Sequence, residues 1–345
     1  MDVASQLRAT AEHTLNALIP ANAVCAVLDY SSIRNTGDAL LYQGAYRYLE
    51  SRGATIVYEA DHVTFDADHL RSRLPADGII LFHGGGNMNN IWPGHMEFRF
   101  RVLKAFPDHR IIQLPQSVFF DDPEMLRKTK ESFTAHRDYV LCARDQRSFD
   151  YCRDTLGVRT ELCPDMAFFL PPRDTSGIPK RWHLAHFRQD KERASDVGSA
   201  AFFRSFTQEK WLRGFMPSFL FFLFLKAVVL GLRRIGLKTL ARPFADFITR
   251  YVHWYTEGQF RHAYRALHQA DLVVTDRLHV FISCVLFNIP NVILDNSYGK
   301  LQNFYHTWLE GLPLTRLAAT ETEAVAQVQD LERAFNLKPA PNGTK

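Results

Sequence analysis

The chain has 345 residues, long enough for two domains of ordinary size that each bury a core of their own. A formal net charge of +4, with no basic stripe interleaved with aromatic residues, argues against nucleic-acid binding. Five cysteines without CxxC spacing predict reduced thiols in the cytoplasm, and the polar first segment does not have the pattern of a secretory signal.

Up to about residue 170, short apolar runs alternate with helix-like segments, as in βα units with a parallel sheet. The predicted strands are 24–28, 55–58, 79–82, 111–114, 139–142 and 161–163. After the first strand, Asn35-Thr36-Gly37-Asp38 predicts a loop that carries the N-cap of a helix over 39–49. The N-terminus of that helix is predicted either to bind an anion in the crevice or to be a capped helix end with no ligand.

The pattern breaks at Pro171-Pro172, before a new strand-like run at 182–187. We therefore expect an N-terminal domain over 1–175, a C-terminal domain over 176–338 and a disordered polar tail over 339–345. No repeat or low-complexity tract is evident within the two domains.

An apolar and then basic element stands out within residues 200–242 of the expected C-terminal domain. Its apolar part, 215–232, contains Pro217 and Lys226 and is shorter than the ~20 apolar residues that span a bilayer. Arg233, Arg234, Lys238 and Arg242 follow it. The pattern favours an element on a membrane surface, with the basic residues on anionic lipid, over a buried helix, a dimer contact or a true span.

Two apolar runs near the C-terminus, 272–274 and 292–294, are each followed by a polar segment. The first leads to Arg277 and His279, the second to Lys300. Ligands of α/β proteins bind at the carboxyl ends of such strands, so these residues predict an anion site with a proton donor. The alternative is that the charges cap helices or form surface ion pairs.

His83-Gly84-Gly85-Gly86-Asn87 follows the predicted strand 79–82. The dinucleotide fingerprint G-x-G-x-x-G is absent, and the nucleophile elbow G-x-S-x-G that accompanies a hydrolase HGGG loop is absent too. The segment is therefore interpreted either as a glycine loop that lines a substrate cleft, with Asn87 as a polar contact, or as a structural turn.

Gln116 and Arg144 follow further predicted strands and are candidates for the same sheet edge. For Arg144 an ion pair with Asp145 or Asp165 is the competing interpretation. No group of histidine, cysteine and acidic residues has metal-ligand spacing, so no metal site is expected. His95, His183 and His186 are each interpreted as structural or exposed.

Seven motifs occur in the order found in a known family: Asn35-Thr36-Gly37-Asp38, Gly84-Gly85-Gly86-Asn87, Leu114-Pro115-Gln116-Ser117, Ala143-Arg144-Asp145, Pro164-Asp165, Thr275-Asp276-Arg277-Leu278-His279 and Ser297-Tyr298-Gly299-Lys300. On these residues the chain resembles the polysaccharide pyruvyl transferases. The resemblance covers about 24–173 and 270–310, and the sequence departs from the family pattern between about 190 and 260. It implies two Rossmann-like domains facing across a cleft, as in the glycosyltransferase-B fold.

The resemblance also implies transfer of a pyruvyl group from phosphoenolpyruvate to a sugar as a ketal, with no cofactor and no metal. Arg277, His279 and Lys300 would bind phosphoenolpyruvate, and Arg144 is a further donor-binding candidate. We assign catalytic roles to His279, as the acid, and to Asp38, which would orient a hydroxyl. The acceptor-binding candidates are Asn87, Gly85, Gly86 and Gln116.

The expected partners are phosphoenolpyruvate, a glycan acceptor on a lipid carrier, and a membrane surface contacted through residues 215–242. The protein would then be cytoplasmic and peripheral on the cytoplasmic face of the membrane, with no nucleic-acid partner. The alternatives are a glycosyltransferase that uses a nucleotide sugar on the same fold, and a non-catalytic scaffold of a polysaccharide assembly complex.

Overall fold

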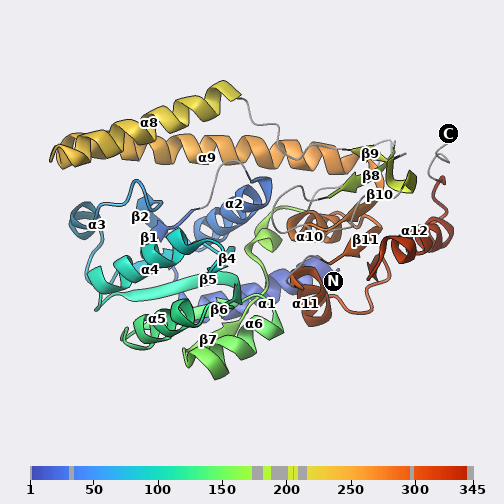
Figure 1. Cartoon of the computed structure of the whole chain (residues 1–345), viewed down its shortest axis with the longest axis horizontal. Helices are drawn as coiled ribbons and strands as arrows, with labels where there is room; N and C mark the ends of the chain where they lie inside the picture. Colours follow the sequence, from blue (N-terminus) through green and yellow to red (C-terminus); the bar gives the residue numbers. More distant parts are fainter. Residues whose placement is uncertain are drawn as a thin grey trace. The chain divides into compact units, whose positions relative to one another are not determined.

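A computed structural model describes residues 2–30, 35–172, 182–187, 201–204, 206–208, 216–295 and 299–339 (Figure 1). The chain forms two compact units. The N-terminal unit consists of Leu7–Leu170 and Gly214–Gly258, and the C-terminal unit consists of Met1–Gln6, Pro171–Arg213 and Gln259–Lys345. This division differs from the expected one, because residues 214–258 belong to the N-terminal unit.

The N-terminal unit contains a seven-stranded parallel sheet in the order β2-β1-β3-β5-β6-β7, with β4 paired to β5. Its strands are β1 (Val24–Leu28), β2 (Thr55–Ala60), β3 (Ile79–Phe82), β4 (Gly85–Asn89), β5 (Arg110–Phe119), β6 (Tyr139–Ala143) and β7 (Thr160–Leu162). Six of these are the predicted strands. Together with the C-terminal sheet they confirm the α/β class.

The glycine segment was expected to be a loop, but most of it is the strand β4. Gly85 pairs with Gln116 of β5 and has a φ of 133°, which favours glycine. A Cβ atom on Gly84 would lie 2.5 Å from the carbonyl oxygen of Pro115, so only glycine allows β5 to approach this closely. The run of glycines therefore serves close strand pairing.

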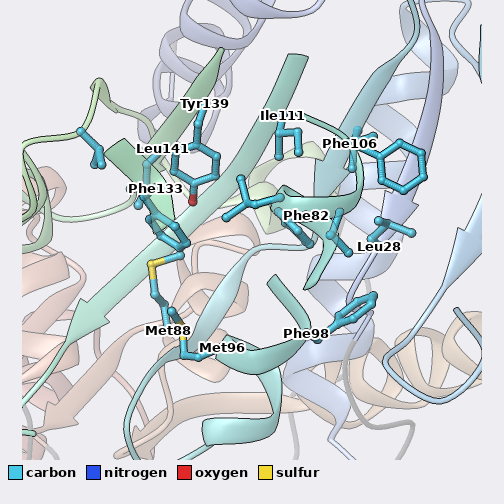
Figure 2. Close-up of a cluster of buried hydrophobic side chains, with 14 of the residues drawn as sticks. Leu28, Phe82, Met88, Met96, Phe98, Phe106, Ile111, Phe133, Tyr139 and Leu141 are labelled. Atoms are coloured by element: carbon cyan, nitrogen blue, oxygen red, sulfur yellow. The ribbon is translucent and has the colours of Figure 1, made fainter. Parts of the chain in front are cut away.

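Side chains on the strands alternate between the two faces of this sheet, and each face carries a core of its own. On one face, Leu28, Phe82 and Ile111 pack with Met96 and Phe98 (Figure 2). The helices of the N-terminal unit are α1 (Val3–Leu18), which begins in the C-terminal unit, α2 (Thr36–Ser51), α3 (Ala67–Arg73), α4 (Pro93–Ala105), α5 (Pro123–Thr134), α6 (Gln146–Asp150), the π-helical turn Tyr151–Leu156 and the 3₁₀ turn Met166–Phe169. α1 and α2 cover the opposite face of the sheet, where Leu15 and Tyr48 are buried.

Two long helices, α8 (Met216–Arg234) and α9 (Lys238–His268), run side by side, and α8 and the part of α9 up to Gly258 belong to the N-terminal unit (Figure 1). Phe222, Val229 and Ile248 are buried there, packed with Tyr30 and with Tyr42 of α2. This packing gives the predicted apolar element a protein partner on one side.

Basic side chains fasten this helix pair to the segment 61–66. Lys226 pairs with the buried Asp61, Arg233 donates to the carbonyl oxygens of residues 63–65, and Arg242 pairs with Asp66 at 3.3 Å. The expectation that Arg233 and Arg242 contact lipid is therefore corrected, because both guanidinium groups are used within the protein. Between residues 216 and 258, the exposed arginine and lysine residues of the pair are Arg234, Lys238 and Arg250.

The outer side of the helix pair is apolar. Among the described residues, eleven of the thirteen exposed large hydrophobic side chains fall between 220 and 254: Leu220, Phe221, Leu223, Phe224, Leu230, Ile235, Leu237, Leu240, Phe244, Phe247 and Trp254. We call these eleven residues the exposed apolar face. No helix within the described part of the chain has the length and apolar character needed to cross a membrane.

The C-terminal unit contains a five-stranded parallel sheet in the order β12-β11-β10-β8-β9. Its elements are β8 (Trp182–His186), β9 (Thr207–Gln208), β10 (Ala270–Thr275), β11 (Asn291–Leu294), β12 (Thr315–Ala318), α7 (Ala201–Arg204), α10 (Leu278–Leu286), α11 (Lys300–Trp308) and α12 (Glu321–Ala334). Leu272 and Val274 of β10 are buried with Val328 and Leu331 of α12. Apart from Pro339, the predicted tail lies outside the described residues.

Candidate active site

Arg277 directly precedes α10 and comes two residues after the end of β10 in the C-terminal unit. The buried Thr275 hydroxyl donates to the carbonyl oxygen of His186 (2.8 Å) and accepts from the backbone amide of Arg277 (3.0 Å). These two hydrogen bonds fix the turn, so that the backbone of Arg277 is held at the carboxyl edge of the sheet. His279 follows in the first turn of α10, half-buried like Arg277.

His186 ends the neighbouring strand β8, where it is paired with Thr275. Only 4% of its surface is exposed. Burial, together with the positive charge of Arg277, lowers the pKa of His186 to about 3, so the imidazole is neutral at pH 7. The sequence had suggested a structural or exposed residue, but the structure places His186 within the electrostatic reach of Arg277.

Lys300 begins α11, after β11, on the other side of β10 from β8. Asp295, just past the end of β11, accepts a hydrogen bond from the amide of Leu301 (3.2 Å) and holds the helix start in place. Because β10 and β11 are parallel neighbours, the segments that carry Arg277 and Lys300 begin at the same edge of the sheet. Ser297 and Tyr298 of the predicted motif lie outside the described residues.

A buried polar network occupies the corresponding edge of the N-terminal sheet. Asp29 directly follows β1 and is fully buried. One of its oxygens, Oδ1, lies 2.6 Å from Nδ1 of His95, and the other, Oδ2, lies 2.8 Å from Nη1 of Arg99. Arg99, also fully buried, donates in addition to Gln113 Oε1 and to Asn87 Oδ1, both at 2.9 Å.

Two predicted acceptor residues belong to this network. The side-chain oxygen of Asn87 accepts from Arg99 and from Nε2 of Gln116 (3.2 Å). Gln116 has no exposed surface, so it orients Asn87 and does not itself reach solvent. Gly85 is buried in β4 and Gly86 is partly exposed beside it.

Arg144 is buried in an ion pair, the alternative that the sequence left open. Its Nη1 lies 2.9 Å from Asp165, and its Nε donates to Ser117 Oγ (2.9 Å). Ser117 in turn donates to Asp145 (2.6 Å). A guanidinium committed in this way stabilises the ends of β5 and β6, and its geometry does not resemble a site prepared for a ligand phosphate.

Asp38 lies in the first turn of α2, partly exposed, where Asn35 caps the helix by accepting from the amide of Gly37. The nearby His83 is 1% exposed, and its Nδ1 lies 3.0 Å from the carbonyl oxygen of Gly84. Burial lowers the pKa of His83 although the Asp38 carboxylate acts in the opposite direction. Asp38 is thus the more accessible of the two.

Sequence reasoning missed Asp29, Arg99 and the pairing of His95. Asp29 stands directly after a predicted strand, the rule that selected Gln116 and Arg144, and could have been found by the same rule. The burial of Arg99 could also have been predicted, because Arg99 falls on the apolar stripe of α4, three residues from Met96 and from Val102. No local sequence pattern identifies the role of His95, because its partner Asp29 lies 66 positions away.

Within the part of the chain that the structure describes, no group of three or more histidine, cysteine or acidic residues is arranged to hold a metal ion. The five cysteines are buried as free thiols. The two sheet edges carry arginine, lysine, histidine and carboxylate side chains.

The fold is shared with a crystal structure of a functionally uncharacterised protein from Klebsiella pneumoniae. The two chains superpose with a TM-score of 0.59 at 17% identity, over 91% of this chain and 99% of the other. At that identity the likeness shows the α/β fold with parallel sheets.

Sequence comparison is more specific. The family model of the polysaccharide pyruvyl transferases matches residues 35–298. Pyruvyl transferase 1 of Schizosaccharomyces pombe is 28% identical over 84% of this chain and 70% of its own length. EpsO of Bacillus subtilis, whose name assigns it provisionally to the pyruvyl transferases, is 28% identical over 87% of this chain and 90% of its own. The chain belongs to the polysaccharide pyruvyl transferase family.

Proposed function

We propose that this protein transfers the pyruvyl group of phosphoenolpyruvate to two hydroxyls of a sugar, as a ketal, and releases phosphate. The observation that supports this most directly is the edge of the C-terminal sheet, where Arg277 and Lys300 begin the segments after two parallel neighbours and His279 follows in the same turn as Arg277. Membership of the family and the names of the relatives agree with the proposal.

Phosphoenolpyruvate carries a carboxylate and a phosphate, so a donor site needs fixed cations. A guanidinium can bind either group through two parallel hydrogen bonds, and an ammonium serves as a point charge. In this proposal Arg277 and Lys300 bind the donor. The neutral, buried His186 beside Arg277 adds no competing charge at pH 7. Arg144 is left out of the donor set, because it is paired with Asp165.

The reaction requires one proton on carbon and the removal of two hydroxyl protons. Protonation of the methylene carbon by His279 makes C2 electrophilic, and the first sugar hydroxyl forms a C–O bond there. The proton of that hydroxyl passes to a base and then to solvent, from which His279 regains a proton. The bond from C2 to the phosphate oxygen then breaks, the second hydroxyl attacks C2, and its proton is carried away by phosphate. The N-terminal unit supplies the acceptor residues, Asp38 and Asn87 among them.

A nucleotide-sugar glycosyltransferase remains the competing function on this fold, and a non-catalytic scaffold is the alternative of another class. Thermal unfolding with each donor separates them. A ligand at about 100 times its dissociation constant adds about 2.7 kcal/mol to the free energy of unfolding. We expect phosphoenolpyruvate to raise the melting temperature, and Arg277→Ala to abolish that rise because the donor loses its bidentate partner.

Arg333→Ala, an exposed arginine of the same unit, is the matched control and should keep the rise. His279→Ala should lose turnover while keeping donor stabilisation, since an acid is needed for chemistry and not for binding. Loss of both would make His279 a donor ligand instead. Stabilisation by a nucleotide sugar alone would establish the glycosyltransferase, and none by any donor would favour the scaffold.

We further propose that the protein works at the cytoplasmic face of a membrane, on a glycan acceptor held by a lipid carrier. The exposed apolar face supports this, because eleven large apolar side chains project from one pair of helices and the turn between them. Charge complementarity selects the partner: Arg234, Lys238 and Arg250 are exposed on the same helices, and no acidic residue occurs from 216 to 245. An anionic lipid surface fits both features.

Co-sedimentation with vesicles tests the membrane proposal. We expect the protein to bind vesicles that contain about one third phosphatidylglycerol, and to bind less at higher salt. Each basic residue near an anionic surface contributes about 1 kcal/mol, so the double variant Arg234→Gln, Lys238→Gln should bind about 30-fold more weakly. The pair Phe224→Gln, Trp254→Gln should also lower binding, because these side chains are 62% and 65% exposed.

Phe335→Gln, an exposed aromatic residue of the C-terminal unit, is the control and should bind as the unmodified protein does. Equal binding by all variants would exclude the apolar face as the membrane contact. A different result would be that the protein fails to bind vesicles and forms a dimer that the Phe224→Gln, Trp254→Gln variant dissociates. In that case the exposed apolar face would be a contact between two copies of the chain.

A further inference from the structure

Asp29 is held in an unusual conformation by its surroundings. Its φ is 63°, in the left-handed region that few residues other than glycine adopt, and its amide donates to the carbonyl oxygen of Ala60 (2.9 Å). Its carboxylate is buried between His95 and Arg99. Strained residues with buried charge cost stability, and they tend to occur where function needs a side chain in one fixed position.

Arg99 holds the carboxylate of Asp29 in one position. Its guanidinium is fully buried, lies 5.5 Å from the ring centre of Phe82, and is bound by Gln113 and Asn87 as well as by Asp29. With three partners it cannot swing away. One carboxylate oxygen is therefore committed to Arg99, and the other is presented to His95.

The contact of Asp29 with His95 selects the tautomer of the imidazole. Nδ1 lies 2.6 Å from a carboxylate oxygen, which accepts only, so Nδ1 carries a proton and donates it. The amide nitrogen of Asn87 lies 3.2 Å from the same Nδ1, which as a donor cannot accept from it. In the neutral ring the lone pair then lies on Nε2.

His95 is also the accessible member of the set. Its side chain is 22% exposed, whereas those of Asp29 and Arg99 have no exposed surface. The arrangement has the form that enzymes use for proton transfer: a buried carboxylate orients an imidazole, whose far nitrogen is left to take a proton. By comparison, His83 is 1% exposed and bonded to a backbone carbonyl.

We infer that His95 is the base that accepts the proton of the attacking sugar hydroxyl, with Asp29 and Arg99 as its positioning residues. This inference rests on the proposed pyruvyl transfer and assigns a group to one of its proton steps. As the hydroxyl oxygen bonds to C2 of the donor, its proton passes to Nε2 of His95. The imidazolium that forms is stabilised by Asp29. The proton then passes from His95 to solvent, from which His279 regains the proton that it gave to the methylene carbon.

The charged and titratable groups that face the imidazole of His95 are Asp29, Arg99 and, with ring centres 6.1 Å apart, His62. Asp29→Asn should slow turnover, because it removes the negative charge that stabilises the imidazolium formed in the reaction. Its stabilisation by phosphoenolpyruvate should be unchanged.

The test uses the full chain with saturating phosphoenolpyruvate and three acceptor probes, the octyl glycosides of glucose, galactose and mannose, with phosphate release and ketal formation as readouts. General bases contribute about 10²- to 10⁴-fold, so His95→Gln should slow turnover by at least about 100-fold. Its stabilisation by phosphoenolpyruvate should be unchanged. Added imidazole should restore part of the activity of His95→Ala, which a structural role would not allow.

His69→Gln, a half-buried histidine of the same unit, is the matched control and should retain full turnover. Nitrogen-15 spectra of the unmodified protein supply an independent readout, and should show the proton on Nδ1 of His95. The role of His95 would be contradicted by a proton on Nε2, or by turnover of His95→Gln within about threefold of the unmodified protein. Either result would leave the proposed pyruvyl transfer intact. An unmodified protein that is not stabilised by phosphoenolpyruvate and forms no ketal would overturn the proposed function, and the inference with it.

Discussion

Arg99→Met should lower the free energy of unfolding by about 3–5 kcal/mol, the usual result of removing one partner of a buried ion pair. The change leaves the Asp29 carboxylate without its cation and takes a donor from both Gln113 and Asn87. Methionine fills much of the volume of arginine, so the loss of charge dominates over cavity formation. Equilibrium unfolding in urea, followed by circular dichroism, measures the difference.

Arg101→Met is the control, because Arg101 is exposed two residues further along the same helix and should change stability by less than about 1 kcal/mol. The Arg99 and Asp29 atoms meet at 2.8 Å without a well-aligned hydrogen bond, so charge is the main link between them. The double variant Asp29→Asn, Arg99→Met should therefore lose much less than the sum of the single changes. Additive losses, or a loss below about 1 kcal/mol for Arg99→Met, would contradict this account.

Glu59 should make the protein less stable as pH rises from about 4.5 to about 7. Burial raises the pKa of its carboxyl from 4.5 to about 7, although the hydroxyl of Tyr42 donates to it at 2.9 Å and acts in the opposite direction; Tyr46 donates to it as well. The folded state keeps the proton where the unfolded state has lost it. The stabilising contribution is thus complete below about pH 4.5 and lost above about 7, and amounts to about 3 kcal/mol at most.

Glu59→Gln cannot ionise, so its stability relative to the unmodified protein should rise by up to about 3 kcal/mol between pH 4.5 and pH 8. Urea unfolding at a series of pH values gives this difference directly. Glu97→Gln, an exposed glutamate of the same unit, should show a flat difference over the range. A flat difference for Glu59→Gln would mean that its carboxyl titrates normally in the folded protein.

Most of the strands could be predicted from sequence because parallel strands buried on both faces consist of unbroken apolar runs, as at 24–28 and 272–274. The glycine segment was misjudged for a related reason. Its pairing with β5 depends on how closely the backbone at Gly84 approaches Pro115, and spacing along the chain carries no information about that distance. The N-cap within 35–38 was predicted, since capping is a local interaction, but the helix begins at Thr36 and not at residue 39.

The same distinction between local and long-range interactions applies to the residues of the candidate site. Arg277, His279 and Lys300 could be selected because each follows a strand within a few residues. The burial of Arg144 against Asp165 could be offered only as one of two interpretations, because burial depends on the packing of β5, β6 and the segment after β7 together. Likewise the basic residues after α8 look equivalent in sequence, but Arg233 binds the carbonyl oxygens of residues 63–65 and Arg234 is exposed.

The sequence by itself determined the parallel α/β class, the family and the sheet edges that carry polar residues, because apolar runs, helix caps and ordered motifs are properties of neighbouring residues. The tertiary structure alone decided that α8 and the first part of α9 pack with the N-terminal unit, and that Asp29, His95 and Arg99 form one network. Those outcomes join residues as far apart as Asp61 and Lys226. They depend on desolvation and on the geometry of long-range contacts, which no local pattern records.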